Sequence, residues 1–216
     1  MGKEAQIENL AEAIREGDSQ RSEVVAREAV ELRLNSLEVL ERGVINPIRG
    51  VGDKYGRGEL FLTDLVMSAE AAKAAMKVLA SEVEKAGKQV RYLGRVILGT
   101  VAGDIHSIGK NIVNALLSAE GFEIIDLGVD VPTEIFVQKV RELKPDILGL
   151  SALITTAMLV QGEVIEALKR KGLRDSVKVM VGGAPVTAEW AESIGADAYG
   201  SDVTDAVRKA KQLVNG

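Results

Sequence analysis

The chain has 216 residues, 27 Lys and Arg against 32 Asp and Glu, one histidine and no cysteine. Its 46% hydrophobic residues argue against disorder, and interspersed charges with few aromatic side chains argue against nucleic-acid binding. The lack of cysteine excludes disulfides and thiolate metal sites, and no segment is typical of an apolar leader or a membrane span. We therefore expect a cytoplasmic protein without a membrane partner.

The first part of the chain has the apolar spacing of helices, as at Ile7, Leu10 and Ile14. Breaks at REGDSQ, RGVINPIRGVGDKYGRGE and EKAGKQ predict helices near residues 3–16, 20–42, 45–56 and 61–86, which could close as a small bundle. The rhythm changes after Gly87, so we place a domain boundary near residues 88–92.

The second part alternates short apolar runs with amphipathic helices. The runs are RVILGTV, FEIIDLG, DILGLSA, VKVMVGG and a weak DAYG. Continuous apolar runs are typical of parallel strands buried on both faces of a sheet. We predict an α + α/β chain with a helical domain over 1–88 and an α/β domain over 89–216.

In an open parallel sheet, ligands bind beyond the carboxyl ends of the strands. Three loops lie at such ends. They are Gly103-Asp104-Ile105-His106-Ser107-Ile108-Gly109 after the first strand, Ser151-Ala152-Leu153-Ile154-Thr155-Thr156 after the third, and Gly182-Gly183-Ala184-Pro185 after the fourth.

The first loop holds the single histidine. A lone histidine is usually an ordinary surface or core residue, and one imidazole cannot build an all-protein metal cage. It can be an axial ligand to a macrocycle that supplies its own equatorial donors. Asp104 could accept the other N–H of the His106 imidazole, and Gly109 would let a flat ligand come close.

The other two loops have plainer interpretations as well. The Ser and Thr side chains of SALITT are typical helix N-caps, although capping does not exclude ligand contact. The VGGAPVT stretch is consistent with a simple strand-to-helix turn capped by Thr187, whereas Gly182 and Gly183 would also permit close approach by a ligand.

Together, D-x-H-x-x-G, S-x-L and G-G behind a helical half resemble the cobalamin-binding module of the methionine synthase type. The resemblance is closest to the small two-domain corrinoid proteins of methyltransferase systems and covers nearly the whole chain. GELFLTDLVMSAEAAKAAMKVL matches the last helices of the bundle and GDIHSIGKNIV the most diagnostic loop. It implies a four-helix bundle cap followed by a flavodoxin-like (Rossmann-like) five-stranded parallel sheet.

The resemblance also implies the cofactor, which is cobalamin or a related corrinoid bound base-off/His-on, with His106 as the metal ligand and Asp104 orienting it. The nucleotide tail would enter a slot beside the sheet. The expected cofactor-binding residues are Gly103, Asp104, Ile105, His106, Ser107, Ile108, Gly109, Ser151, Leu153, Thr155, Thr156, Gly182, Gly183, Ala184, Tyr199 and Gly200. Candidates for a lid over the corrin are Phe61, Leu62, Leu65 and Met67, each of which could equally be bundle core.

The implied function is a methyl carrier without catalytic residues of its own. Its partners would be a substrate:corrinoid methyltransferase, a corrinoid:folate or corrinoid:thiol methyltransferase, and a reductive activase. The methyl donor stays open. Alternatives are a cobalamin-dependent sensor, which would need an output module, and a flavodoxin-like domain that binds another nucleotide or none.

The chain departs from the methionine synthase pattern at one position. That pattern has a serine that completes a relay to the Asp–His pair, where this chain has Ala157. Thr155 or Thr156 could take its place.

Overall fold

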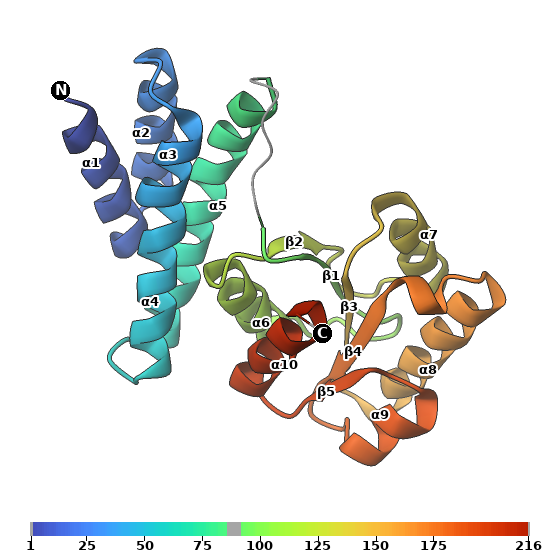
Figure 1. Cartoon of the computed structure of the whole chain (residues 1–216). Helices are drawn as coiled ribbons and strands as arrows, with labels where there is room; N and C mark the ends of the chain where they lie inside the picture. The colour runs from blue at the N-terminus through green and yellow to red at the C-terminus, as the bar shows by residue number, and fades with distance from the viewer. Residues whose placement is uncertain (1, 86–91, 216) are drawn as a thin grey trace. The chain divides into compact units, whose positions relative to one another are not determined.

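The structure is a computed structural model that describes residues 2–85 and 92–215 (Figure 1). The chain divides into two compact units. One consists of Met1–Tyr92 with Ser118–Gly121, and the other of Leu93–Leu117 with Phe122–Gly216. The expected boundary between residues 88 and 89, and the expected helix end at residue 86, lie outside the described residues.

Within residues 2–85, the first unit is a bundle of four helical rods, as the resemblance implies. The third rod is continuous, because a π-helical turn joins two α-helices without a break. The elements are α1 (Lys3–Glu16), α2 (Ser19–Glu31), α3 (Ser36–Leu40), η1 (Glu41–Ile45), α4 (Asn46–Gly56) and α5 (Leu62–Lys85). The long helix α5 packs against each of the other three rods. None of the described helices combines the length and the apolar composition of a membrane span.

The predicted helix over 20–42 is wrong, because α2 ends at Glu31. Arg33 has a left-handed backbone (φ 52°), which an α-helix cannot continue through. Two residues later, the side chain of Asn35 accepts hydrogen bonds from the N–H groups of Leu37 and Glu38 and caps a new helix.

The break predicted before residue 45 is also wrong. Gly43 and Val44 are buried inside η1, and Gly43 lies so close to Leu10 that an added Cβ would stand 3.0 Å from Leu10 Cδ2. This glycine serves close helix packing and does not end the helix. The wide π turn ends two residues before Pro47, whose ring and missing N–H disfavour an ordinary helical turn in the preceding residues.

The second unit contains a parallel sheet of five strands in the order β2-β1-β3-β4-β5. The strands are β1 (Arg95–Thr100), β2 (Glu123–Asp126), β3 (Ile147–Ser151), β4 (Lys178–Gly182) and β5 (Ala198–Gly200), which confirms each of the apolar runs. The central strands β1, β3 and β4 are largely buried, whereas the edge strands β2 and β5 are half-buried.

Helices cover both faces of this sheet. In Figure 1, α6 (Ile108–Ala119) and α10 (Val203–Asn215) lie on one side, and α7 (Thr133–Leu143), α8 (Thr155–Arg170) and α9 (Ala188–Ile194) on the other. A short 3₁₀ turn, η2 (Arg174–Ser176), precedes β4. The chain leaves β1 toward β2 and returns to β3 on its other side, so the strand order reverses between β1 and β3. This switch point is where α/β sheets of this order bind ligands.

Candidate functional site

The strand register brings the predicted loops to one place. Thr100 of β1 pairs with Ser151 of β3, Ser151 with Gly182 of β4, and Gly182 with Gly200 of β5. Each of these residues ends its strand. The loops that follow therefore start side by side at the carboxyl edge of the sheet.

His106 and Asp104 form a pair at this edge. Nδ1 of His106 lies 2.7 Å from Oδ1 of Asp104, which also accepts the backbone N–H of His106 at 2.9 Å. The carboxylate can only accept, so Nδ1 carries the proton and Nε2 keeps its lone pair. The Asp104 side chain is fully buried, whereas that of His106 is 53% exposed. Among the described residues, Nε2 has no hydrogen-bond partner.

The other oxygen of Asp104, Oδ2, accepts the backbone N–H of Leu153. Burial raises the pKa of the Asp104 carboxyl, but the N–H groups of Leu153 and His106 outweigh burial and hold this pKa below its usual range. Asp104 is therefore an anion at neutral pH, and it joins the first loop to the second.

The contact with Leu153 takes the place of the relay serine that is missing at position 157. Ala157 is a buried residue of α8, and the third partner of Asp104 is the backbone of Leu153. Thr155 and Thr156 are exposed. The expected Ser or Thr cap is wrong, because the N-cap of α8 is Ile154, without a side-chain hydrogen bond.

Two further sets of contacts lie in the histidine loop and directly after it, and neither was predicted from the sequence. The hydroxyl of Thr100 donates to the backbone carbonyl of His106 at 2.9 Å. The loop is followed by Lys110, whose ammonium lies 2.6 Å and 2.5 Å from the two oxygens of Asp126 and 2.9 Å from Oδ1 of Asn111. The sequence did contain a signal for this ion pair. Lys110 is a charged residue in the otherwise apolar start of α6, and Asp126 is a residue of opposite charge at the end of the next strand, β2.

A cavity of about 670 Å³ opens between the loops. It is lined by most of the predicted binding residues, namely Ile105, His106, Ser107, Ile108, Gly109, Ser151, Leu153, Gly182, Gly183, Ala184, Tyr199 and Gly200. The sequence analysis missed the rest of its lining: Leu98, Lys110, Val113, Gly149, Leu150, Met180, Val181, Ser201, Asp202, Val203 and Ala206. Four predicted residues do not line it: Gly103, Asp104, Thr155 and Thr156.

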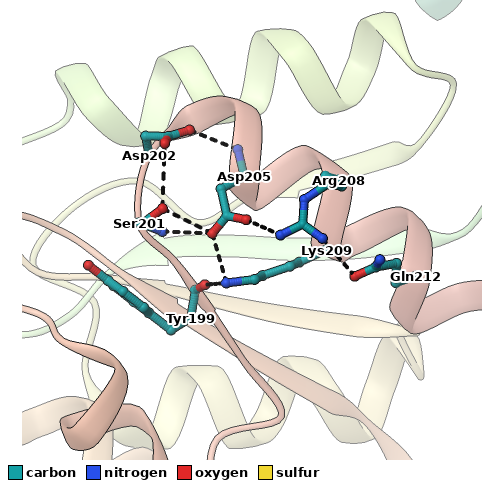
Figure 2. Close-up of polar contacts among 7 residues, drawn as sticks. All are labelled: Tyr199, Ser201, Asp202, Asp205, Arg208, Lys209 and Gln212. Carbon is teal, nitrogen blue, oxygen red and sulfur yellow. Dashed lines mark hydrogen bonds and ion pairs between the residues drawn. The ribbon is translucent and has the colours of Figure 1, made fainter.

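Hydrogen bonds fix the turn at the β5 end of the cavity (Figure 2). Oδ2 of Asp205 accepts from the backbone N–H and hydroxyl of Ser201, both at 3.1 Å, and lies 2.7 Å from Nζ of Lys209. Lys209 also donates to the carbonyl of Tyr199, and Arg208 donates to Oδ1 of Asp205. The contact with Lys209 is the main cause that lowers the pKa of Asp205 well below its ordinary value.

The backbone conformation and close packing at position 183 require glycine. Its φ of 128° is one that side-chain-bearing residues rarely adopt, and an added Cβ would stand 1.7 Å from the carbonyl oxygen of Ala152. The turn after β4 is thus pressed against the turn after β3. Thr187 caps α9 as predicted, accepting the N–H of Trp190 at 3.1 Å.

The four lid candidates belong to the first unit and differ in exposure. Leu65 is fully buried in the bundle core, so its plainer interpretation holds. Leu62 is half-buried. Phe61 is 81% and Met67 53% exposed, so these two side chains are available for contact with another molecule.

The single imidazole of this site suits a metal that is already bound within a macrocycle. Within the described residues, no group of three or more His, Cys, Asp or Glu side chains could hold a metal ion. The imidazole offers one nitrogen, and the exposed apolar side chains of Ile105, Ile108 and Leu153 stand around it at the cavity. The residues present therefore fit a macrocycle above His106 with an appended group in the cavity.

The fold and this site are typical of a protein that binds a cofactor at the switch point of a flavodoxin-like sheet. The comparisons identify the family. The model of a B12 binding domain matches residues 94–208, and a second model, also described as a B12 binding domain, matches residues 6–80. The chain belongs to the B12-binding corrinoid protein family.

Similar proteins span the whole chain. It is 48% identical to the trimethylamine corrinoid protein of Methanosarcina barkeri, over 99% of this chain and 98% of that protein. Among solved structures, the methanol:cobalamin methyltransferase complex MtaBC of M. barkeri is 30% identical, with a TM-score of 0.86 over 100% of this chain and 81% of that one. The monomethylamine corrinoid protein of M. barkeri is 37% identical, with a TM-score of 0.55 over 98% and 100%.

Proposed function

We propose that this chain is a methyl carrier that binds cobalamin or a related corrinoid and passes a methyl group between two partner methyltransferases. The first partner would take the methyl group from a methylated substrate, and the second would give it to a folate or thiol acceptor. A reductive activase would restore the cofactor after accidental oxidation. The similarity to corrinoid proteins of trimethylamine and monomethylamine supports a methylamine as the methyl source.

The observation that carries this proposal is the buried Asp104 paired with an exposed His106 at the mouth of the cavity. When bound, the corrinoid supplies a cobalt atom that can accept and release a methyl group. His106 would hold the lower face of that cobalt through Nε2. Asp104 fixes the tautomer in which Nε2 is a base and makes the imidazole a stronger donor.

The cavity beside the sheet would take the nucleotide tail of the corrinoid, which is displaced when the histidine binds cobalt. Ser151 and Leu153 would lie along one side of the tail, and Gly182 and Gly183 would form the floor. We assign corrinoid binding to an α/β domain over 89–216. A helical domain over 1–88 would shield the upper face, with Phe61 and Met67 as its most available apolar side chains.

The histidine assignment can be tested by electron paramagnetic resonance. Because the chain has a single histidine, [¹⁵N]histidine labels one imidazole only. In the cobalt(II) form of the loaded full-length protein, a ¹⁵N ligand splits the cobalt lines into doublets, whereas the unlabelled benzimidazole of the tail would give triplets. We expect doublets for the wild type.

His106→Gly is the matched variant. It should still bind cobalamin through the tail cavity but lose the doublets, and added free imidazole should restore nitrogen ligation as triplets. Triplets in the labelled wild type, which would come from the unlabelled benzimidazole of the tail, would contradict His-on binding. Absence of corrin bands from the visible spectrum of the reconstituted wild type would contradict the proposal as a whole.

The methylamine assignment needs a separate assay. The loaded protein, reduced and mixed with a trimethylamine methyltransferase, should be methylated with trimethylamine as donor and should show the methylated spectrum. A methanol methyltransferase with methanol is the matched control. Faster methylation in the methanol reaction would overturn the choice of donor and leave the carrier role standing.

A further inference from the structure

Asp130, in the loop between β2 and α7, has a backbone conformation that is unusual for its type. Its φ is 52°, in the left-handed region, although it is not glycine. Aspartate tolerates this region better than most residues, but the conformation still costs free energy and persists only where surrounding contacts hold it. The resemblance assigns no role to Asp130, and its side chain does not line the cavity.

Asp130 is bonded twice to the loop that precedes His106. Its backbone N–H donates to the carbonyl of Asp104 at 2.9 Å, and its Oδ1 accepts the N–H of Gly103 at 2.8 Å. The left-handed backbone brings both groups to the same loop. The segments are already side by side, because Val131 donates to the carbonyl of Thr100 at 3.0 Å.

These bonds act on the backbone that carries the Asp104 carboxylate. The bond from the Gly103 N–H holds the peptide group that joins Ala102 to Gly103, and the bond to the Asp104 carbonyl holds the peptide group that joins Asp104 to Ile105. Gly103 has a φ of 81°, and an added Cβ would meet no atom within 4 Å, so side-chain packing does not hold this part of the loop. The two hydrogen bonds to Asp130 therefore limit rotation of the backbone between these two peptide groups, which contains Gly103 and Asp104.

The position of the carboxylate then decides the orientation of the imidazole. Oδ1 of Asp104 accepts both the backbone N–H and Nδ1 of His106. A rotated Asp104 backbone would carry Oδ1 away from Nδ1, and the imidazole is exposed, with its ring held by no other described hydrogen bond. The first effect would be a weaker preference of the His106 imidazole for the Nδ1–H tautomer.

We propose that Asp130 is a positioning residue for His106. It clamps the Gly103–Asp104 backbone and so keeps the imidazole in the Nδ1–H tautomer with Nε2 directed at its ligand. The effect on the tautomer concerns the chain alone, whereas its consequence for cobalt rests on the proposed function.

Three variants separate the clamp from general backbone effects. Asp130→Gly keeps the N–H and the left-handed backbone but removes the carboxylate that accepts from Gly103. Asp130→Asn keeps an oxygen acceptor and tolerates the same φ. Lys144→Gly is the matched control, because Lys144 is also a left-handed non-glycine residue (φ 45°) and ends α7, outside the histidine loop.

The first readout needs no cofactor. In the [¹⁵N]histidine-labelled apoprotein, at a pH where the imidazole is neutral, ring nitrogen shifts report the tautomer of the only histidine. We expect Nδ1–H in the wild type, in Asp130→Asn and in Lys144→Gly. In Asp130→Gly, the ratio of Nε2–H to Nδ1–H should rise by about 3- to 10-fold, which is the scale of one ordinary hydrogen bond. The folded signal is separate from that of unfolded chains, so a loss of stability would not hide the result.

The second readout is the doublet signal of cobalt(II) in the loaded proteins, which should fall several-fold in Asp130→Gly alone. An unchanged tautomer in Asp130→Gly, or an equal change in Lys144→Gly, would overturn the role of Asp130. A shifted tautomer with no doublets in any loaded protein, wild type included, would uphold Asp130 and refute the histidine–cobalt bond.

Discussion

The buried ion pair of Lys110 and Asp126 predicts unequal costs for removing its two partners. Only 1% of the Lys110 side chain is exposed, compared with 24% for Asp126. If Lys110 is replaced by Met, the carboxylate keeps the N–H of Gly128 at 2.9 Å and the amide of Asn114 at 3.3 Å, and it reaches water. If Asp126 is replaced by Ala, the ammonium keeps, among the described residues, only the amide oxygen of Asn111 at 2.9 Å, and it has almost no access to water.

The magnitudes follow from these surroundings. Removing one partner of a buried pair costs about 3–5 kcal/mol when the remaining charge is uncompensated. We expect that cost for Asp126→Ala and about 1–2 kcal/mol for Lys110→Met, whose remaining carboxylate is still hydrogen-bonded. The double variant should be more stable than Asp126→Ala, because no buried charge is left.

The assay is urea unfolding of the full chain, followed by the fluorescence of Trp190. This is the only tryptophan in the sequence and packs on the core of the α/β unit. With a slope of about 1–3 kcal/mol per M, a difference of about 2 kcal/mol between the variants separates their midpoints by roughly 1 M. Equal midpoints, or a lower midpoint for Lys110→Met, would refute the argument from exposure.

Two further predictions concern the turns around the cavity. Gly183→Ala should destabilise the α/β unit by about 3 kcal/mol or more and abolish corrinoid binding, because its Cβ would lie 1.7 Å from the carbonyl oxygen of Ala152; a urea midpoint and corrin spectrum like the wild type would contradict this. Asp205→Asn should cost about 1–3 kcal/mol at pH 7, where Asp205 is ionised and bonded to Lys209. Because folding lowers the pKa of Asp205, its contribution is complete above the unfolded value of about 3.9 and is lost as the pH falls below it, so thermal melts of the two proteins should converge at low pH.

The strands and loops of the α/β unit could be predicted because both signals are local. A run such as DILGLSA is apolar at every position that β3 buries, and the polar or glycine residues after it mark the carboxyl end of the strand. The helical half was less predictable, because helix ends there depend on tertiary packing. Gly43 looks like a helix break in the sequence, but it is buried against Leu10 within a continuous rod.

The contacts that hold the site were less predictable for a similar reason. The bond between Asp104 and Leu153 uses a backbone N–H, which every non-proline residue has, so no residue type marks it. The clamp by Asp130 needs a left-handed φ that only the folded loop shows. The sequence pattern therefore directs attention to Ala157 and the neighbouring threonines, whereas the contacts are made by the backbone of Leu153 and by Asp130.

The backbone donors to Asp104 also explain how the direction of Nε2 can be kept when the site has a single histidine. A carboxylate held only by the imidazole would rotate with it, and the direction of Nε2 would follow. Here the Leu153 N–H and the His106 N–H hold Asp104 independently of the ring. Because these donors belong to the main chain, the carboxylate would stay in place when the imidazole releases its proposed ligand. The same tautomer and direction would then be ready for the next ligation, as the proposed carrier role requires.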